Sequence, residues 1–183
     1  MSDLILTRRL LLRPLTLDDA APTARLMSPG IARWTGSWQG ETSAREVAER
    51  IQQTLELARR GQAFNRAIER RGDGALIGWI GGRRSEAEPR RAAIGYWIGE
   101  AFFGRGYTRE AAAALLPRLW DALDVDVVEG VAQLPNAASI AVLRGLGMRH
   151  VGQRMEFAKA RGAADLCEAF EIERPDPPAE IGG

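Results

Sequence analysis

The sequence predicts one α/β domain with a mixed, mostly antiparallel central sheet flanked by helices. Residues 92–98 form an apolar run rich in Ile, Tyr and Trp, which is typical of a buried strand. A glycine-containing turn follows, and then residues 107–123 place apolar side chains at helical spacing. Two more strand patterns, 64–70 and 75–83, flank a short turn and indicate an antiparallel hairpin. Antiparallel strands therefore precede a crossover through a helix.

The N-terminal third predicts a strand and two helices. Residues 4–13 cluster Leu and Ile around three arginines, which indicates a first strand. Residues 16–19 combine a hydroxyl with two acids, a helix start that suits the positive end of the helix dipole. We expect Pro29 and Gly30 to end that helix. A capping-box pattern then opens a second helix over residues 43–60.

The C-terminal half predicts two crossovers and a closing pair of strands. Residues 84–91 are polar and should form an exposed connection into the central strand. A Val-rich strand pattern over 126–133 precedes a helix start at Pro135 and Asn136. Two final strand patterns cover 148–154 and 166–174.

Length, charge and cysteine count limit the class of protein. The 183 residues suffice for one buried core, so we expect a single domain over 1–174 and an unstructured tail over 175–183. The net charge of +1 gives no field that would require nucleic acid or membrane lipid as a partner. One cysteine, Cys167, and one histidine, His150, allow no internal disulfide and no zinc cluster, so we expect both to be structural. Without a membrane-spanning run or a secretion signal, the sequence predicts a cytoplasmic, metal-free protein.

The turn after the central strand carries the first functional motif. Gly104, Arg105 and Gly106 are followed by Thr108 in the opening turn of the predicted helix. Free N–H groups and the dipole make a helix start attractive to anions, and glycines let phosphates approach the backbone. A plain tight turn would use the same glycines. A dinucleotide fingerprint would need glycine where Arg109 stands, and the Gly-Lys-Ser/Thr of a nucleotide P-loop is absent.

Two blocks of sequence match a known pattern. The first is IGYW at 94–97 followed by FFGRGYTREA at 102–111, and the second runs from Asn136 through Ser139 to Gly-Leu-Gly-Met at 145–148. Together they resemble the GNAT superfamily of acetyl-CoA-dependent N-acetyltransferases, and in particular its RimJ/RimL-like branch, which carries an Asn-x-x-Ser…Leu-Gly-Phe block. The resemblance covers nearly the whole domain, because the predicted order of elements is also that of the GNAT fold.

The resemblance implies a binding site for acetyl-CoA as cosubstrate. Backbone N–H groups of the glycine turn would hold the CoA pyrophosphate, and the end of the central strand would pair with the pantetheine arm. Asn136 and Ser139 would face CoA near its sulfur, although Asn136 is also a good helix N-cap. Ala101 departs from the Gln or Arg that similar enzymes usually carry, which we interpret as a mark of the branch. The implied cofactor residues are Trp97, Ile98, Phe103, Gly104, Arg105, Gly106, Tyr107, Thr108, Asn136 and Ser139.

The chemistry needs support for a departing thiolate and for an oxyanion. Many GNAT enzymes use a tyrosine seven residues after the Asn as general acid, but Leu143 stands there. Ser139 is therefore our candidate to support the thiolate, and a thiol pKa of about 8.5 makes a hydrogen bond sufficient. The resemblance implies that a backbone N–H near Ile98 meets the oxyanion, because this strand splays from its neighbour in the family.

The base that deprotonates the amine is the least defined part of the site. Glu129 ranks first because it lies in register with an apolar strand face, and Glu168 and Glu100 are alternatives. For Glu129 and Glu168, the competing interpretation is a carboxylate that points outward at a strand edge or pairs with an arginine. Deprotonation through water is a further alternative.

Trp34 and Trp38 are the candidate acceptor residues. They lie in the polar connection between the first two helices, which the resemblance places beside the acceptor site. They could form an apolar or cation-binding wall, and ordinary loop packing is the competing interpretation.

The sequence supports three functional hypotheses. The first is an N-acetyltransferase in which a primary amine, from a protein N-terminus or a small molecule, attacks directly in a ternary complex. The second is a GNAT-like module that binds acyl-CoA without turnover, and the third is a binder of another phosphate ligand. A homodimer is a further expectation, because dimers are common among similar proteins.

Overall fold

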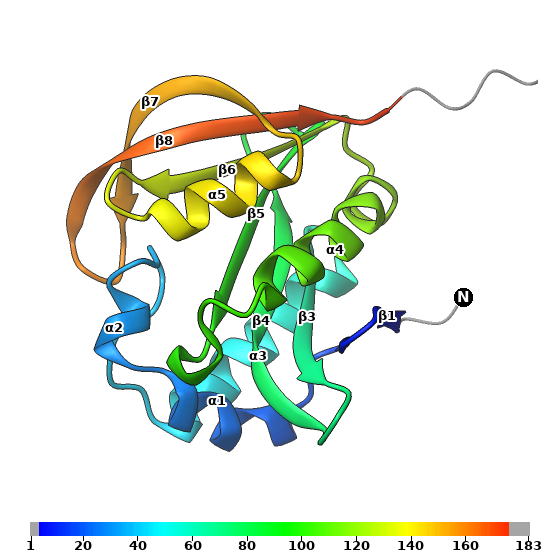
Figure 1. Cartoon of the computed structure of the whole chain (residues 1–183), viewed down its shortest axis with the longest axis vertical. Coiled ribbons are helices and arrows are strands. Elements are labelled where there is room, and N and C mark those ends of the chain that lie inside the picture. The colour runs from blue at the N-terminus through cyan, green and yellow to red at the C-terminus, as the bar shows by residue number, and fades with distance from the viewer. Residues whose placement is uncertain (1–3, 176–183) are drawn as a thin grey trace, which may run out of the picture.

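A computed structural model describes residues 4–175 as an eight-stranded sheet with helices on both faces (Figure 1). The strand order is β1-β2-β3-β4-β5-β6-β8-β7. The strands are β1 Ile5–Leu6, β2 Leu10–Arg13, β3 Ala63–Arg70, β4 Ala75–Arg84, β5 Arg91–Ile98, β6 Val127–Gln133, β7 Arg149–Ala158 and β8 Ala163–Glu173. The helices are η1 Leu17–Asp19, α1 Ala20–Leu26, α2 Pro29–Ala32, α3 Ala44–Arg59, η2 Glu100–Phe102, α4 Tyr107–Leu123 and α5 Ala137–Gly145. None of these helices is long and apolar enough to cross a membrane.

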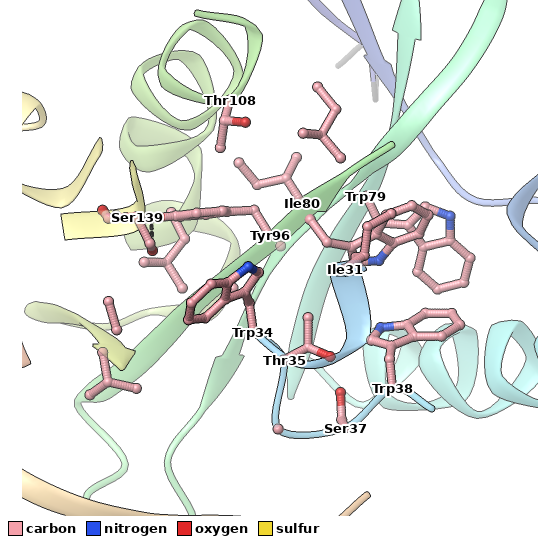
Figure 2. Close-up of a pocket in the computed structure, with 18 of the residues that line it drawn as sticks. Ile31, Trp34, Thr35, Ser37, Trp38, Trp79, Ile80, Tyr96, Thr108 and Ser139 are labelled. Carbon is pink, nitrogen blue, oxygen red and sulfur yellow. Dashed lines mark hydrogen bonds between the residues drawn. The ribbon is translucent and has the colours of Figure 1, made fainter. Parts of the chain in front are cut away.

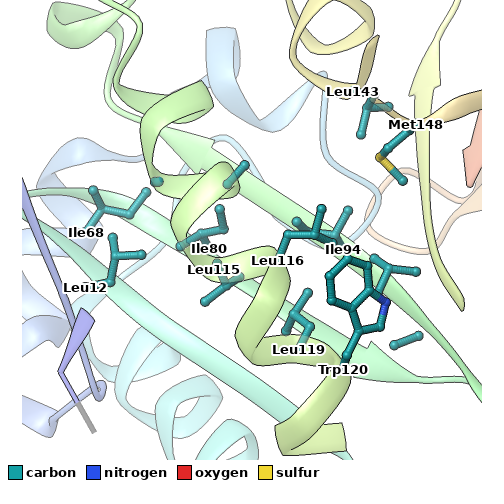
Figure 3. Packing of buried hydrophobic residues seen from close by; sticks show 14 of the residues in the cluster. Leu12, Ile68, Ile80, Ile94, Leu115, Leu116, Leu119, Trp120, Leu143 and Met148 are labelled. Carbon is teal, nitrogen blue, oxygen red and sulfur yellow. The ribbon is translucent and has the colours of Figure 1, made fainter. Parts of the chain in front are cut away.

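Two hydrophobic cores lie on opposite faces of the sheet. Leu115, Leu116 and Leu119 of α4 pack with Ile80 and Ile94 on one face, where α5 also lies (Figure 3). The other face is covered by α1, α2 and α3, and its core is made by Trp38, Val47, Ile51, Trp79 and Trp97, among others. Because both faces are covered, the middle strands are buried on both sides, as their apolar sequences predict.

Most of the predicted elements are confirmed. The β3–β4 hairpin pairs in antiparallel register, and β5 and α4 lie where the patterns at 92–98 and 107–123 place them. The capping box of α3 is present, since the Glu46 carboxylate accepts from the Ser43 N–H at 2.7 Å. Ser43 Oγ accepts from the Glu46 N–H at 3.2 Å in return.

The single strand predicted over 4–13 is wrong. The segment folds into the antiparallel pair β1 and β2, joined by a tight turn. Thr7 makes this turn, because its N–H donates to the Leu10 carbonyl at 2.9 Å and its Oγ1 accepts from the Leu10 N–H at 2.8 Å. Because apolar residues lie on both sides of the turn, the sequence pattern resembles that of one continuous strand.

Two other boundaries differ from the prediction. The first helix ends at Leu26, and Pro29 opens the short helix α2 instead of ending α1. Ser28 caps α2 by accepting from the Ile31 N–H at 3.3 Å, and a proline in the first turn of a helix loses no hydrogen bond. Strands β7 and β8 are longer than predicted, because their hairpin continues to a turn after Ala158. The predicted tail lies outside the described residues beyond residue 175.

Among the strands described over residues 4–175, β5 and β6 are the only parallel neighbours, and they pair over three residues. The paired residues are Arg91–Ala93 of β5 and residues 127–129 of β6. β6 then continues with β8, while residues 94–98 of β5 pair with β4 alone. The Gly99 N–H donates to the Ile77 carbonyl of β4 at 2.8 Å. Because N–H groups along an antiparallel strand point alternately toward and away from the partner strand, those of Ile98 and Tyr96 point away from β4, into the gap between β5 and β6.

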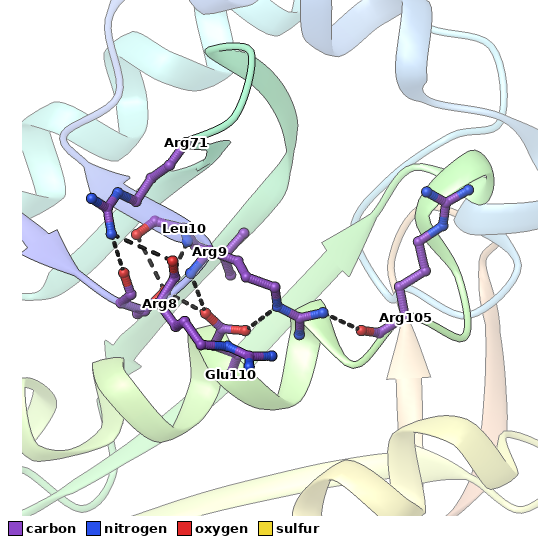
Figure 4. Close-up of polar contacts among 7 residues, drawn as sticks. Arg8, Arg9, Leu10, Arg71, Arg105 and Glu110 are labelled. Carbon is purple, nitrogen blue, oxygen red and sulfur yellow. Dashed lines mark hydrogen bonds and ion pairs between the residues drawn. The ribbon is translucent and has the colours of Figure 1, made fainter.

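A polar cluster ties the β1–β2 turn to the start of α4 (Figure 4). The Glu110 carboxylate accepts from Thr7 Oγ1 at 2.6 Å, from the Arg9 N–H at 2.8 Å and from Arg9 Nε at 2.6 Å. Arg9 Nη1 also donates to the Arg105 carbonyl at 2.9 Å. Burial raises the pKa of Glu110, but the hydrogen bonds from Thr7 and Arg9 outweigh it, so this pKa lies below its ordinary value of 4.5. The cluster thus fixes the glycine turn from outside.

Glu110→Gln should lower the free energy of unfolding by about 2 kcal/mol at neutral pH, because hydrogen bonds to a charged acceptor are lost. The depressed pKa means that this stabilisation is complete above about pH 4.5 and is lost as the pH falls through the folded-state value. Urea unfolding at several pH values measures both effects. Glu49→Gln is the control, because its ion pair with Arg45 is exposed and should contribute less than about 1 kcal/mol. A pH-independent difference for Glu110→Gln would contradict the assignment.

Candidate functional site

A cavity of about 870 Å³ opens where β5 leaves β6. Its walls come from both faces of the sheet. Tyr96, Thr108 and Ser139 line it on the α4–α5 side, and Trp38 and Trp97 line it on the α1–α3 side. Figure 2 shows Thr108 and Ser139 on one side of the strand and Trp38 on the other. The gap in the sheet therefore joins two half-sites into one cavity.

The glycine turn forms one end of the cavity. Gly104 and Gly106 have φ angles of 70° and 74°, a conformation that favours glycine, and Gly106 is the N-cap residue of α4. No side chain caps this helix, so the N–H groups of its first turn are free for a ligand. A Cβ at Gly104 would meet nothing within 4 Å, which leaves room beside the backbone. The turn has the geometry and dipole of an anion site.

Tyr96 and Ser139 meet across the gap between β5 and α5. Their hydroxyl oxygens lie 2.9 Å apart (Figure 2). Burial raises the pKa of Tyr96 to about 12, although the hydrogen bond with Ser139 opposes the shift. The phenol therefore stays protonated at neutral pH and can donate. Asn136 Oδ1 accepts from the Ser139 N–H at 3.1 Å, which confirms Asn136 as the N-cap of α5.

No role for Tyr96 was predicted from the sequence. Its only sequence signal is its place one residue before Trp97 in the strand motif, where strand alternation turns it toward α4 and α5. Which side chain it would meet there depends on how α5 packs. That packing could not be predicted from the motif.

Nearly all of the predicted cofactor residues line the cavity. They are Trp97, Ile98, Phe103, Gly104, Gly106, Tyr107, Thr108, Asn136 and Ser139. Arg105 does not line it, because the backbone carbonyl of this residue is turned outward and accepts from Arg9. The binding role of these residues stays a prediction.

Glu129 does not lie on the cavity wall. Its carboxylate accepts from Arg154 Nη1 at 3.1 Å, so the alternative in which it pairs with an arginine is confirmed. Glu168 and Glu100 do not line the cavity either: Glu168 accepts from Gln153 at 2.9 Å, and Glu100 accepts from Ser28. The structure therefore does not bring any of the three predicted bases to the reacting groups.

Trp34 and Trp38 both line the cavity. Trp38 is only 6% exposed and packs edge-on against Trp79 and Trp97, with ring centroids 5.2 and 5.5 Å apart. Trp34 is half-buried, and the Arg33 guanidinium lies 4.2 Å from its ring centroid. Trp38 therefore packs in the core and also lines the cavity, so both interpretations hold for it.

The connection between α2 and α3 is bound to the β7–β8 turn across one side of the cavity. The Ala160 N–H donates to the Gly36 carbonyl at 3.0 Å, and Arg161 Nη1 donates to the Ala32 carbonyl at 3.3 Å. Gln133 Nε2 donates to the Arg33 carbonyl at 2.8 Å. These bonds hold the α2–α3 connection against the β7–β8 turn and β6.

Comparisons with known proteins agree on the family. The family model for the acetyltransferase (GNAT) domain matches residues 9–149. An uncharacterized N-acetyltransferase, p20 of Bacillus licheniformis, is 28% identical over 157 residues, which is 85% of this chain and 88% of that protein.

Solved structures share the fold at low sequence identity. Mycobacterium smegmatis RimJ in complex with CoA-disulfide has a TM-score of 0.80 and 24% identity, covering 92% of this chain and 84% of that one. The acetyltransferase of Salmonella typhimurium that modifies the N-terminal serine of 50S ribosomal subunit protein L7/L12 has a TM-score of 0.80 and 20% identity, covering 94% of this chain and 99% of that one.

Tyr96 should titrate later than an ordinary tyrosine, with a pKa of about 12. The chain has two tyrosines, so ultraviolet absorbance over an alkaline titration can resolve them. Tyr96→Phe should remove the late phase, and Ser139→Ala should move it to higher pH because the hydrogen bond that lowers this pKa is gone. A late phase that survives Tyr96→Phe would contradict the burial of this phenol.

Proposed function

Because the chain belongs to the GNAT acetyltransferase family, we propose that it transfers the acetyl group of acetyl-CoA to a primary amine. The observation that carries the proposal is the cavity, which runs from the anion site at α4 through the gap in the sheet to the opposite face. A cofactor on one face and an acceptor on the other would meet in the gap. There the amine would attack the thioester directly in a ternary complex.

The α4 side of the cavity suits acetyl-CoA. The N–H groups around Gly104 and Gly106 would hold the pyrophosphate, and the free edge of β5 at residues 94–98 would pair with the amides of the pantetheine arm. RimJ of M. smegmatis, which has the same fold, was solved with CoA-disulfide. Binding by the backbone would not need the Gln or Arg side chain that Ala101 replaces.

The reacting groups follow from this arrangement. The amine nitrogen forms a bond to the acetyl carbonyl carbon, and the oxyanion that develops would be stabilised by the Ile98 N–H, which faces the gap. The carbon–sulfur bond then breaks, and the thiolate takes a hydrogen bond or a proton from the hydroxyl pair of Tyr96 and Ser139. The ammonium proton passes to water, and water in turn returns a proton to the hydroxyl pair or to the thiolate. A neutral amine and acetyl-CoA thus give an amide and the free thiol of CoA, with no net release of a proton.

The acceptor best supported is an α-amino group. The two carboxylates that line the cavity, Glu156 and Asp165, are both engaged by arginines, in pairs with Arg154 and Arg161. An α-amino group has a reference pKa of about 7.7 to 8.0, against about 10.4 for lysine, so it needs little help from a base. The Salmonella relative modifies a protein N-terminus. We infer that a protein N-terminus or an amino acid is the acceptor in a cytoplasmic setting.

Binding of acyl-CoA without turnover is the second candidate. The absence of the commonest acid, which Leu143 replaces, and the engaged carboxylates favour it. The Tyr96–Ser139 pair weighs against it, because the protonated phenol can donate a hydrogen bond to a departing thiolate.

Release of free thiol from acetyl-CoA tests the proposal. Purified protein is mixed with a panel of amines, amino acids and peptides with free N-termini. We expect release that depends on the amine and is faster for α-amino groups than for lysine side chains. Bound acetyl-CoA without release from any acceptor would contradict transfer and favour the binding module.

Gly104→Ala, with Gly61→Ala as its control, tests the cofactor site in the same assay. The two glycines have φ angles of 70° and 67° and open space around a new Cβ, so both variants should lose about 1 to 2 kcal/mol of stability. Only Gly104 lines the cavity, so only Gly104→Ala should weaken CoA binding, by about tenfold or more. Equal CoA affinity in both variants would contradict the assignment of the loop.

A further inference from the structure

Six charged residues line the cavity, and two of them lack a carboxylate partner within residues 4–175. Arg83 pairs with Glu86, Glu156 pairs with Arg154, and Arg161 pairs with Asp165. The two cationic side chains without such a pair are Arg50 and Arg109. Each is a candidate to bind an anionic ligand group.

The two arginines lie on opposite faces of the sheet. Arg109 is in the first turn of α4, and its side chain lies against Gly145 of α5, on the face of the glycine turn. Its position suits the phosphates of CoA. Arg50 is on α3, which covers the other face. Its position therefore suits the acceptor rather than CoA.

The surroundings of Arg50 leave most of its donors for a ligand. Its guanidinium carbon lies 4.3 Å from the ring centroid of Trp38, and its Nη2 donates to the Ser37 carbonyl at 2.6 Å. Burial lowers the pKa of Arg50, although the group remains charged. A guanidinium offers five donors in a planar fork that matches a carboxylate, and here one bond to a carbonyl is made. Partial burial strengthens such a pair by excluding water.

Trp97 does not add a donor to this half of the cavity. Its Nε1 has no hydrogen-bond acceptor within residues 4–175, but the atom is fully buried, so a ligand in the cavity does not reach it. Arg50, by contrast, lines the cavity, and a carboxylate, which is rich in acceptor atoms, complements its unused donors.

We propose that Arg50 is a specificity-determining residue that binds a carboxylate of the acceptor, on the face of the sheet opposite the glycine turn. The inference rests on the proposed transfer to an amine. The carboxylate has two sources of the same chemistry: the α-carboxylate of a free amino acid, or an acidic side chain close to a peptide N-terminus. Stacking on Trp38 fixes the guanidinium plane, which adds direction to the charge.

The test compares kcat/KM for acceptors that differ only in charge. Peptides that begin with Asp or Asn, or carry Glu or Gln at the second position, report on the side chain. Free amino acids and their amides report on the α-carboxylate. The wild type should prefer the carboxylate member of one of these sets by about tenfold or more, as expected for charge-assisted hydrogen bonds.

Arg50→Gln should bring that ratio close to one, and Arg50→Lys should restore only part of it, because an ammonium cannot pair through two parallel bonds. Arg60→Gln is the matched control, since Arg60 is the exposed C-cap residue of the same helix and pairs with Glu56. It should leave the ratio unchanged. If Arg50 only holds the Ser37 loop, Arg50→Gln would lower kcat/KM equally for both members and keep the ratio.

Binding measurements separate this inference from the proposed function. Calorimetry with the acetylated products, N-acetyl-Asp and N-acetyl-Asn peptides or amino acids, reports on the carboxylate site without turnover. Tighter binding of the acidic product, lost in Arg50→Gln, would support the site even if no amine were acetylated. Transfer to neutral and acidic acceptors at equal rates, with equal product binding, would overturn the role of Arg50 and leave the transferase intact.

Discussion

The separation of β5 from β6 is the constraint on which the rest of the structure depends. A parallel pair that stops after three residues leaves the backbone of residues 94–98 without a neighbour on one side, and unpaired N–H groups inside a protein are costly. The structure tolerates the gap because β4 holds the other edge of β5 and β8 holds β6. A ligand that supplies the missing hydrogen bonds would bind where the strand is already prepared for it.

The groups around the gap come from segments far apart in the chain, and a different local interaction holds each of them in place. Gly106 starts α4 in a left-handed conformation, and the Glu110 cluster holds the turn from outside. The Asn136 cap orients Ser139 toward Tyr96. On the opposite face, three indoles make a rigid wall beside Arg50. The half proposed to bind the cofactor thus relies on backbone groups, whereas the half proposed to bind the acceptor relies on side chains.

This difference explains how much could be predicted from the sequence. Backbone sites depend on glycine positions and helix starts, which the sequence displays, so the glycine turn and the helix after it were predicted with their boundaries. Tyr96 contacts α5, and Arg50 contacts the α2–α3 connection. No local sequence pattern predicts how these two segments pack. The position of Glu129 away from the cavity could not be predicted for the same reason, because its partner Arg154 lies on a strand that pairs only with β8. The turn at Thr7 was missed because apolar residues continue on both sides of it.

Hydrogen exchange at the amides of Tyr96 and Ile98 tests the central claim most directly. Nuclear magnetic resonance would compare these amides in the free protein and with CoA, using the Trp97 amide, which faces β4, as an internal reference. The structure predicts that the Tyr96 and Ile98 amides exchange faster than that of Trp97 in the free protein and slow at least tenfold when CoA binds. Amides that are already protected without CoA, or that stay fast when CoA is bound, would contradict the gap as the cofactor site.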